Sequence, residues 1–304
     1  MKKIKFFLLP FIFALVVVSC DKENDSAINT VTQETSSTEV IDVNAYEQLT
    51  TQYLVSVEND TTPPDLTAPL KFWGKLWKGI KKFLNADGEA MLKQYQDYPN
   101  IPITLLVGIG SSIDAVTKNE KITIDSGLPD LLVLEEAKHV GNKFDIIGYN
   151  HYVVVNNVLN DIDQYIAISD IEARDEAIVK RVKKEVSILY PDAQIMEDVV
   201  DYTAFYNSLK LQPGESYTEG TAYYDRVFSS NGKKVDPAFV QILQLYASSY
   251  EAVKEGYIDS FVAYSKTMEQ AVQEDKNLKT DVKEALLIGM ATYRYGIKYY
   301  ASLN

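Results

Sequence analysis

The two histidines of this chain and the acidic residues beside them have the clearest capacity for chemistry. His139 and His151 are the only histidines in 304 residues, and Glu135, Glu136 and Asp145 lie close to them in sequence. An imidazole beside a carboxylate can transfer protons near neutral pH, which a hydrolase of glycans or peptides requires. His151 and Asp145 therefore form the candidate polar site, and a hydrolase is one interpretation of the chain.

The same histidines also have structural explanations. We expect His139 in the last turn of a helix, where the helix dipole favours a positive charge. His151 lies on an apolar face, and a buried histidine that is hydrogen-bonded to a neighbour accounts for it without any activity. The two histidines are twelve residues apart and do not form a His-Glu-x-x-His pattern. Because no cysteine ligand accompanies them, we expect no metal site.

Other catalytic patterns are missing from the sequence. No Gly-x-Ser-x-Gly segment that would carry a catalytic serine is present. Gly108-Ile109-Gly110 lacks the third glycine of a dinucleotide-binding turn, because Ile113 stands at that position. We interpret residues 108–110 as a structural turn and expect neither a cofactor nor an identifiable catalytic residue. A binding or structural role is better supported than an enzyme, with a protein or a glycan as the partner.

The segment before Cys20, the only cysteine, has the form of a secretory signal. Three lysines among the first five residues precede an apolar run over residues 6–18, which is too short to span a bilayer comfortably. Residues 17–20 (Val-Val-Ser-Cys) resemble the lipobox of bacterial lipoproteins, and the acidic residues that follow resemble the surface-export signal of Bacteroidota lipoproteins. The resemblance implies cleavage before Cys20, acylation of Cys20 with palmitate or similar chains, and anchoring to the outer membrane of the cell envelope, on its periplasmic or surface face.

The charge of the chain limits its partners. The formal net charge is −13, and removal of residues 1–19 with their three lysines would make it −16. Binding to nucleic acid requires clustered lysine and arginine side chains that neutralise phosphates. We therefore expect no nucleic-acid partner.

Residues 20–69 are expected to form an acidic tether and a linker after the lipidated cysteine. Residues 21 to about 40 contain almost nothing to bury, so a disordered tether is predicted there. A helix is predicted over Val43–Val57, and a proline-rich stretch up to residue 69 then indicates a linker. The apolar residues at helical spacing in the predicted helix are Tyr46, Leu49, Tyr53 and Val57.

Residues Leu70–Leu84 form the most sharply patterned segment. In a helix, aromatic and aliphatic side chains including Trp73 and Trp77 would share one face. The opposite face would carry Lys71, Lys75, Lys78, Lys81 and Lys82. Such a helix can lie on a membrane or contact an anionic partner, since its lysines would face anionic groups. The more common alternative is that it packs its aromatic face into the domain and leaves the lysines in solvent.

From residue 70 onward the sequence predicts a helical domain, and the fold class expected for the chain is mainly α, with antiparallel helical hairpins or a bundle. A helix is predicted over residues 143–166. Asp236-Pro237 is typical of a helix start, and Gly256 is expected to divide the long apolar stripe that follows. A terminal helix is predicted from Asp281 to about Ala301. The predicted domains are a signal peptide (1–19), the tether and linker (20–69) and the helical domain (70–304).

Two segments resemble a group of uncharacterised Bacteroidota envelope proteins. Residues 142–151 match an Asn-x-aromatic-Asp-x-x-Gly-x-x-His pattern, although Tyr152 stands where an asparagine usually follows the histidine. Residues 283–300, which include Arg294, resemble the closing helix of the same group. The group has no established activity, so the resemblance implies an envelope location and a helical fold.

Overall fold

The computed structural model describes residues 43–59, 88, 90–95, 101–117, 128–191, 208–209, 211–229, 235–253 and 256–302. All of them belong to one compact unit, Glu39–Asn304. The predictions for the signal peptide, for Cys20 and for the Leu70–Leu84 helix with its tryptophans and lysines lie outside the described residues.

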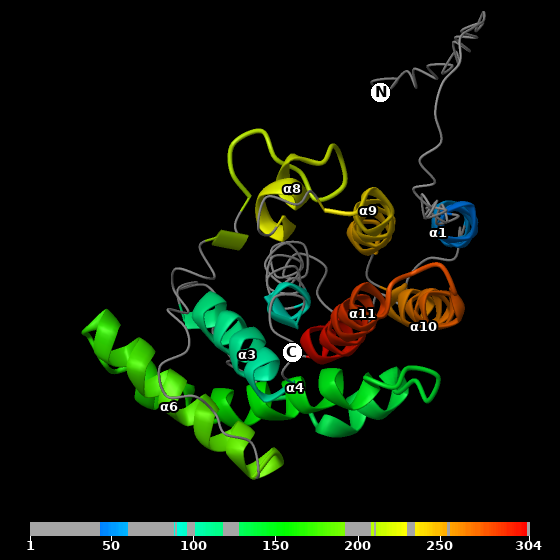
Figure 1. Cartoon of the computed structure of the whole chain (residues 1–304). Helices are drawn as coiled ribbons and strands as arrows, with labels where there is room; N and C mark the ends of the chain where they lie inside the picture. Colours follow the sequence, from blue (N-terminus) through cyan, green and yellow to red (C-terminus); the bar gives the residue numbers. More distant parts are fainter. Residues whose placement is uncertain are drawn as a thin grey trace, which may run out of the picture. The chain divides into compact units, whose positions relative to one another are not determined.

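The fold is mainly α, as predicted, and the described residues contain no strand (Figure 1). Helices of the first half are α1 (Asn44–Asn59), α3 (Ile101–Thr117), η1 (Leu131–Ala137, a 3₁₀ helix), α4 (Asp145–Leu159) and α5 (Ile162–Ile166). Those of the second half are α6 (Ile171–Leu189), α8 (Ala222–Phe228), α9 (Pro237–Glu251), α10 (Ile258–Glu274) and α11 (Thr280–Ala301). None of the described helices is both long and apolar enough to cross a membrane.

Helix α11 is at the centre of the packing. Every residue from Ala285 to Tyr300 is buried, because α4, α10 and η1 all pack against this helix. A helix buried on all sides is normally hydrophobic all round, yet α11 also carries Thr292, Arg294 and Lys298 in this stretch. The charged side chains need partners on the neighbouring helices, and these partners define the candidate site below.

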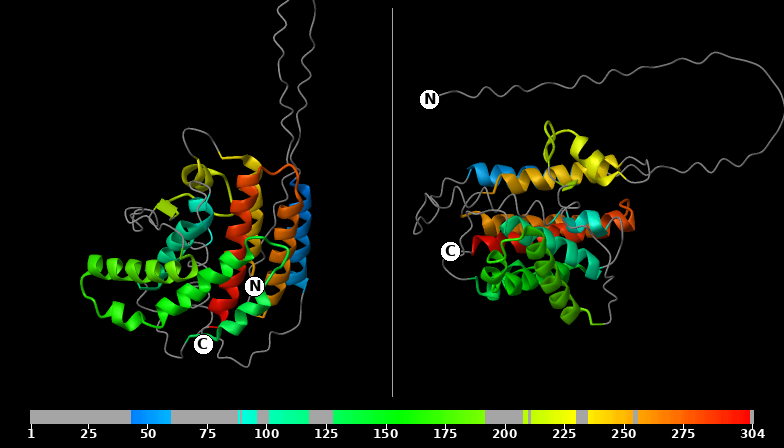
Figure 2. Two further views of the ribbon diagram at one scale, coloured as in Figure 1. Left: turned by 60° about the horizontal axis from the view of Figure 1, so that its bottom comes forward. Right: turned by 90° about the vertical axis from the view of Figure 1, so that its left-hand side faces the viewer.

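Helices α1, α9, α10 and α11 run side by side, while α4 and α6 lie across one side of them (Figure 2). The α1 side chains Tyr46, Tyr53 and Val57 are buried, as their helical spacing predicts. The Tyr53 ring stacks on Tyr264 of α10 with the ring centroids 4.6 Å apart. Helix α1 falls in the segment that the sequence assigned to the tether and linker, but it packs on α9 and α10 as part of the helical unit.

Three helix boundaries show which local signals the structure follows. Asp236 caps α9 with its side chain accepting from the Ala238 N–H, and Gly256, with φ +86°, lies between α9 and α10, as predicted. The single helix predicted over residues 143–166 is instead divided into α4 and α5. Asn160 and Asp161 stand at this break, and such residues favour helix ends because their side chains compete for backbone hydrogen bonds.

We expect Asp236→Ala to lower the free energy of unfolding by about 1 kcal/mol, the usual cost of losing a helix N-cap. The Asp236 carboxylate accepts a 2.9 Å hydrogen bond from the Ala238 N–H, and alanine leaves that donor without its side-chain acceptor. Urea denaturation of both proteins measures the difference. Asp236→Asn is the matched control, because asparagine also caps helices and should retain most of the stability.

The prediction of a turn at residues 108–110 is wrong, since both glycines lie inside α3. A Cβ atom on Gly108 would lie 2.3 Å from Met91 Cγ and 3.1 Å from His151 Cε1. Glycine thus permits the close approach of neighbouring side chains here rather than a change of chain direction.

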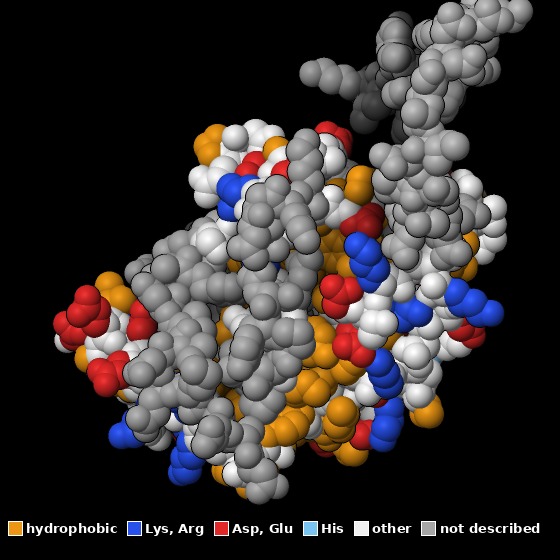
Figure 3. All heavy atoms as spheres, in the orientation of Figure 1, with side chains coloured by type: hydrophobic (Ala, Val, Ile, Leu, Met, Phe, Trp, Pro, Cys, Tyr) orange, Lys and Arg blue, Asp and Glu red, His pale blue; other side chains and the backbone are white. Residues whose placement is uncertain are grey.

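Charges on the described surface are mixed. On the face shown in Figure 3, lysine and arginine side chains are interspersed with aspartate and glutamate side chains. The described part of this face therefore presents no large patch of a single sign.

Candidate functional site

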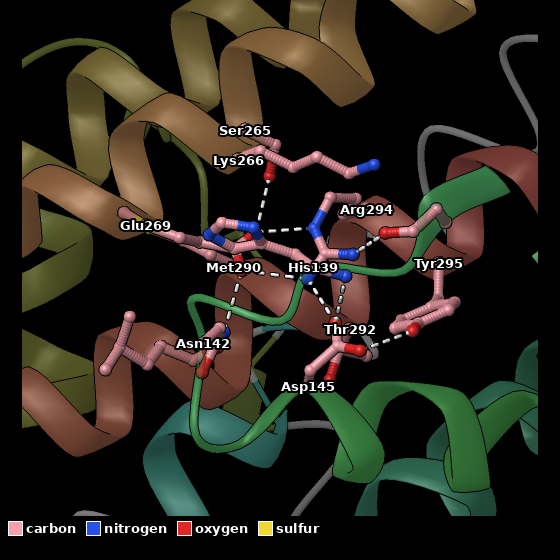
Figure 4. Close-up of polar contacts among 12 residues, drawn as sticks. His139, Asn142, Asp145, Ser265, Lys266, Glu269, Met290, Thr292, Arg294 and Tyr295 are labelled. Atoms are coloured by element: carbon pink, nitrogen blue, oxygen red, sulfur yellow. Dashed lines mark hydrogen bonds and ion pairs between the residues drawn. The ribbon is translucent and has the colours of Figure 1, made fainter. Parts of the chain in front are cut away.

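A cluster of buried polar side chains lies where the start of α4 meets α10 and α11 (Figure 4). Asp145, in the first turn of α4, accepts hydrogen bonds from Arg294 Nη2 and from the Tyr295 hydroxyl, each at 2.7 Å. Both donors are on α11. Burial raises the pKa of Tyr295, and its bond to Asp145 raises it further, so the phenol remains a donor.

Arg294 joins Asp145 to Glu269 of α10. Its Nε lies 2.6 Å from Glu269 Oε1 and its Nη2 lies 2.8 Å from Glu269 Oε2, while Nη1 donates to the carbonyl of Ala137. The side chains of Arg294 and Glu269 are fully buried. Burial alone would lower the pKa of Arg294, but the two carboxylates outweigh it and raise that pKa above its ordinary value.

Asn142 ties the start of α4 to the same carboxylate. Its Nδ2 donates to Glu269 Oε2 at 2.7 Å and to the carbonyl of Leu287 on α11 at 2.9 Å. Its Oδ1 accepts from the Phe144 N–H at 2.8 Å. One amide side chain thus shapes the turn before α4 and fixes that turn to two other helices.

Ser265 and Tyr246 extend the cluster into the aromatic core. The Ser265 hydroxyl donates to Glu269 Oε1 at 2.9 Å, and the oxygen atoms of Ser265 and Tyr246 are 2.6 Å apart. Burial raises the pKa of Tyr246 well above its ordinary value, so this phenol also stays protonated. The chain of bonds connects α9, α10 and α11.

The two carboxylates of the cluster are occupied by hydrogen bonds from neighbouring side chains. Each oxygen of Glu269 accepts two hydrogen bonds, and both oxygens of Asp145 accept from α11 side chains. Buried polar groups that are fully paired are stable, whereas a proton-transfer group must have an atom that reaches a substrate. No group of carboxylate and histidine side chains suited to a metal ion occurs among the residues that the structure describes.

The structure does not bring His151 and Asp145 into one site. They are six residues apart on α4, so their side chains leave the helix in different directions. Asp145 contacts α11, whereas His151 is fully buried near Gly108 of α3, with its ring centroid 4.6 Å from that of Tyr152. The burial of His151 agrees with the structural explanation for this residue.

His139 lies beside the cluster, in the loop between η1 and α4, and not in the last turn of a helix. Its backbone N–H donates to Asp145 Oδ1 at 3.2 Å. Burial lowers the pKa of His139, so the fold favours the neutral imidazole. The expectation of a histidine cation stabilised by a helix dipole is therefore wrong, because the imidazole is partly removed from water.

Glu269 is the charged residue of the cluster that the sequence did not single out. It follows the buried Met268 at the edge of the apolar stripe of α10. At such a position the sequence pattern predicts that a charged side chain faces solvent. Residues 142–151 and 283–300, the two segments with the expected resemblance, meet in this cluster through Asn142, Asp145 and Arg294. In this chain these residues serve the packing of α4 on α11.

Comparison with known proteins adds no relative. No protein family matches the chain, and no curated protein or solved structure matches it significantly. The function must therefore be inferred from the residues themselves.

Proposed function

We propose that this chain is a lipid-anchored protein of the bacterial cell envelope whose helical unit has a binding or structural role. The observation that carries the proposal is the Val-Val-Ser-Cys sequence at residues 17–20, which ends an apolar segment and contains the only cysteine. Acylation would account for a single thiol in an oxidising compartment. The proposed location is the outer membrane, on its periplasmic or its surface face.

The helical unit supports a non-catalytic role because its clustered ionisable groups bond to one another. Arg294 and Glu269 have no exposed surface, and Asp145 is occupied by two donors from α11. Charged side chains that are buried and hydrogen-bonded to one another cannot approach a substrate. We therefore propose that the unit acts through its surface, on a protein or a glycan partner.

Replacing Cys20 by alanine tests the anchor. The variant should move from the membrane fraction to the soluble fraction of lysed cells, because it lacks the acyl chains that hold the protein on a bilayer. Mass spectrometry of the N-terminal peptide of the unchanged protein should show Cys20 as the first residue, carrying the mass of acyl chains.

Ser26→Ala is the matched control, since it makes a similarly small change close to Cys20 without altering residues 17–20. This variant should stay in the membrane fraction. The proposal fails if Cys20→Ala remains bound to membranes, or if the unchanged protein carries a free thiol at the processed N-terminus.

A further inference from the structure

The loop between η1 and α4, residues 138–144, is held closed by the buried cluster. Arg294 donates to the carbonyl of Ala137 directly before the loop, and Asp145 accepts from the His139 N–H within it. Asn142, near the end of the loop, bonds to Glu269. Figure 4 shows His139 and Asn142 beside the charged side chains of α10 and α11. The closed loop therefore depends on contacts with three helices.

The His139 imidazole packs against this loop with one nitrogen sealed from solvent. His139 Nε2 is buried and has no hydrogen-bond partner among the described residues. A Cβ atom on Gly141 would lie 2.9 Å from His139 Nε2 and 2.6 Å from Gln270 Oε1, so the ring is folded back onto the loop beside α10. A larger residue at position 141 would push the ring away.

Charged groups of both signs surround the imidazole, and burial outweighs the attraction of the carboxylates. The imidazole interacts electrostatically with Asp145 of α4, with Lys266 and Glu269 of α10, and with Arg294 of α11. The two carboxylates already accept hydrogen bonds from Arg294, and Glu269 also accepts from Asn142 and Ser265. On the histidine's own segment, Glu135 pairs with Lys138 at 3.5 Å, and Glu136 pairs with Lys298. An imidazolium would therefore lie beside two cations, Lys266 and Arg294, and the two nearby carboxylates already accept hydrogen bonds from other donors.

We propose that His139 makes loop 138–144 a pH-sensitive latch, which the neutral imidazole keeps closed and protonation releases. A protonated Nε2 regains hydration only by leaving its buried position, and the bonds that Asp145 and Glu269 accept from the loop weaken as it does so. Release would change the surface at this corner, where Val140 is 94% exposed and Ile146 is also exposed.

The direction of the pKa shift of His139 determines how the stability of the closed loop changes with pH. Burial lowers the pKa of His139 below its ordinary value of 6.5, so the open loop binds a proton more readily than the closed loop. The closed loop is then most stable above pH 6.5 and loses stability as the pH falls from there toward the lowered pKa.

Hydrogen exchange of the full-length protein, followed by mass spectrometry between about pH 7.5 and 5.5, measures the opening; this window lies above the ordinary range of carboxyl groups. The amides of His139, Asn142 and Phe144 report on the closed loop, because each is hydrogen-bonded there. Their protection, corrected for intrinsic exchange, should fall as the pH is lowered, while amides of α11 should keep theirs.

His139→Gln and His139→Asn cannot take up a proton, so loop protection in these variants should not change across the same window. Either variant suffices if the other does not fold. The proposal is overturned if loop protection in the unchanged protein is constant between the two pH values, or if a folded variant loses protection to the same extent.

Discussion

Replacing Arg294 by methionine is expected to lower the free energy of unfolding by about 3–5 kcal/mol, the usual cost of breaking a buried ion pair by removing one partner. The methionine would leave the fully buried Glu269 without the two bonds that it accepts from the guanidinium. Asp145 and the carbonyl of Ala137 would each lose a donor as well. Denaturant unfolding followed by circular dichroism measures the change.

Two further variants separate lost charge pairing from lost packing. Glu269→Gln combined with Arg294→Met removes both buried charges and should recover part of the stability, since the uncompensated carboxylate is the main cost. Lys138→Met is the matched surface control, because its side chain is 59% exposed and its pairing with Glu135 is loose at 3.5 Å. This control should stay within about 0.5 kcal/mol of the unchanged protein. An Arg294→Met variant as stable as Lys138→Met would contradict the structural role of the cluster.

Local sequence signals predicted much of the helical fold. The terminal helix was expected from Asp281 and is observed over Thr280–Ala301, and α9 starts at the expected Asp236-Pro237 cap. Helical spacing predicted α1 and its buried tyrosines. These features depend on side chains within a few residues of one another, so a single sequence is enough to find them.

Long-range packing was not predictable in the same way. The helix predicted over Val43–Val57 was assigned to the tether and linker region 20–69, and the contact with α9 and α10 makes it part of the helical unit. Gly108 of α3 suggested a turn because its role, to admit Met91 and His151, depends on residues that are distant in sequence. Such tertiary contacts override the secondary-structure preference of the local sequence.

The contacts of the predicted polar residues differ from the expected pairing. Asp145 was singled out together with the nearby His151, but its partner in the structure is Arg294, which lies 149 positions away. A charged residue inside an apolar helix such as α11 signals that a buried partner must exist. That signal does not identify the partner, because carboxylates are abundant in so acidic a chain and only the packing of α10 on α11 selects Glu269.

Replacing Gly148 by alanine is expected to destabilise the protein by about 1–3 kcal/mol, the usual cost of overpacking a close contact. A Cβ atom at this position would lie 2.8 Å from the backbone carbon and oxygen of Ala291 and 2.8 Å from Tyr295 Cδ2. Backbone atoms cannot rotate aside, so α4 must move away from α11. That movement would also lengthen the bonds from Asp145 to Arg294 and Tyr295.

Gly289→Ala provides the comparison that isolates this contact. Both glycines are buried inside helices, so alanine brings the same gain in helix propensity of about 1 kcal/mol at each position. At Gly289 the nearest atom to the new Cβ would be Leu92 Cδ1 at 3.2 Å, the end of a side chain that can shift by a few tenths of an ångström. We therefore expect Gly289→Ala to be neutral or slightly stabilising in thermal unfolding while Gly148→Ala melts at a lower temperature. Equal melting temperatures for the two variants would mean that α4 and α11 are not held together at Gly148, and the packing explanation for the pattern in residues 142–151 would fail with it.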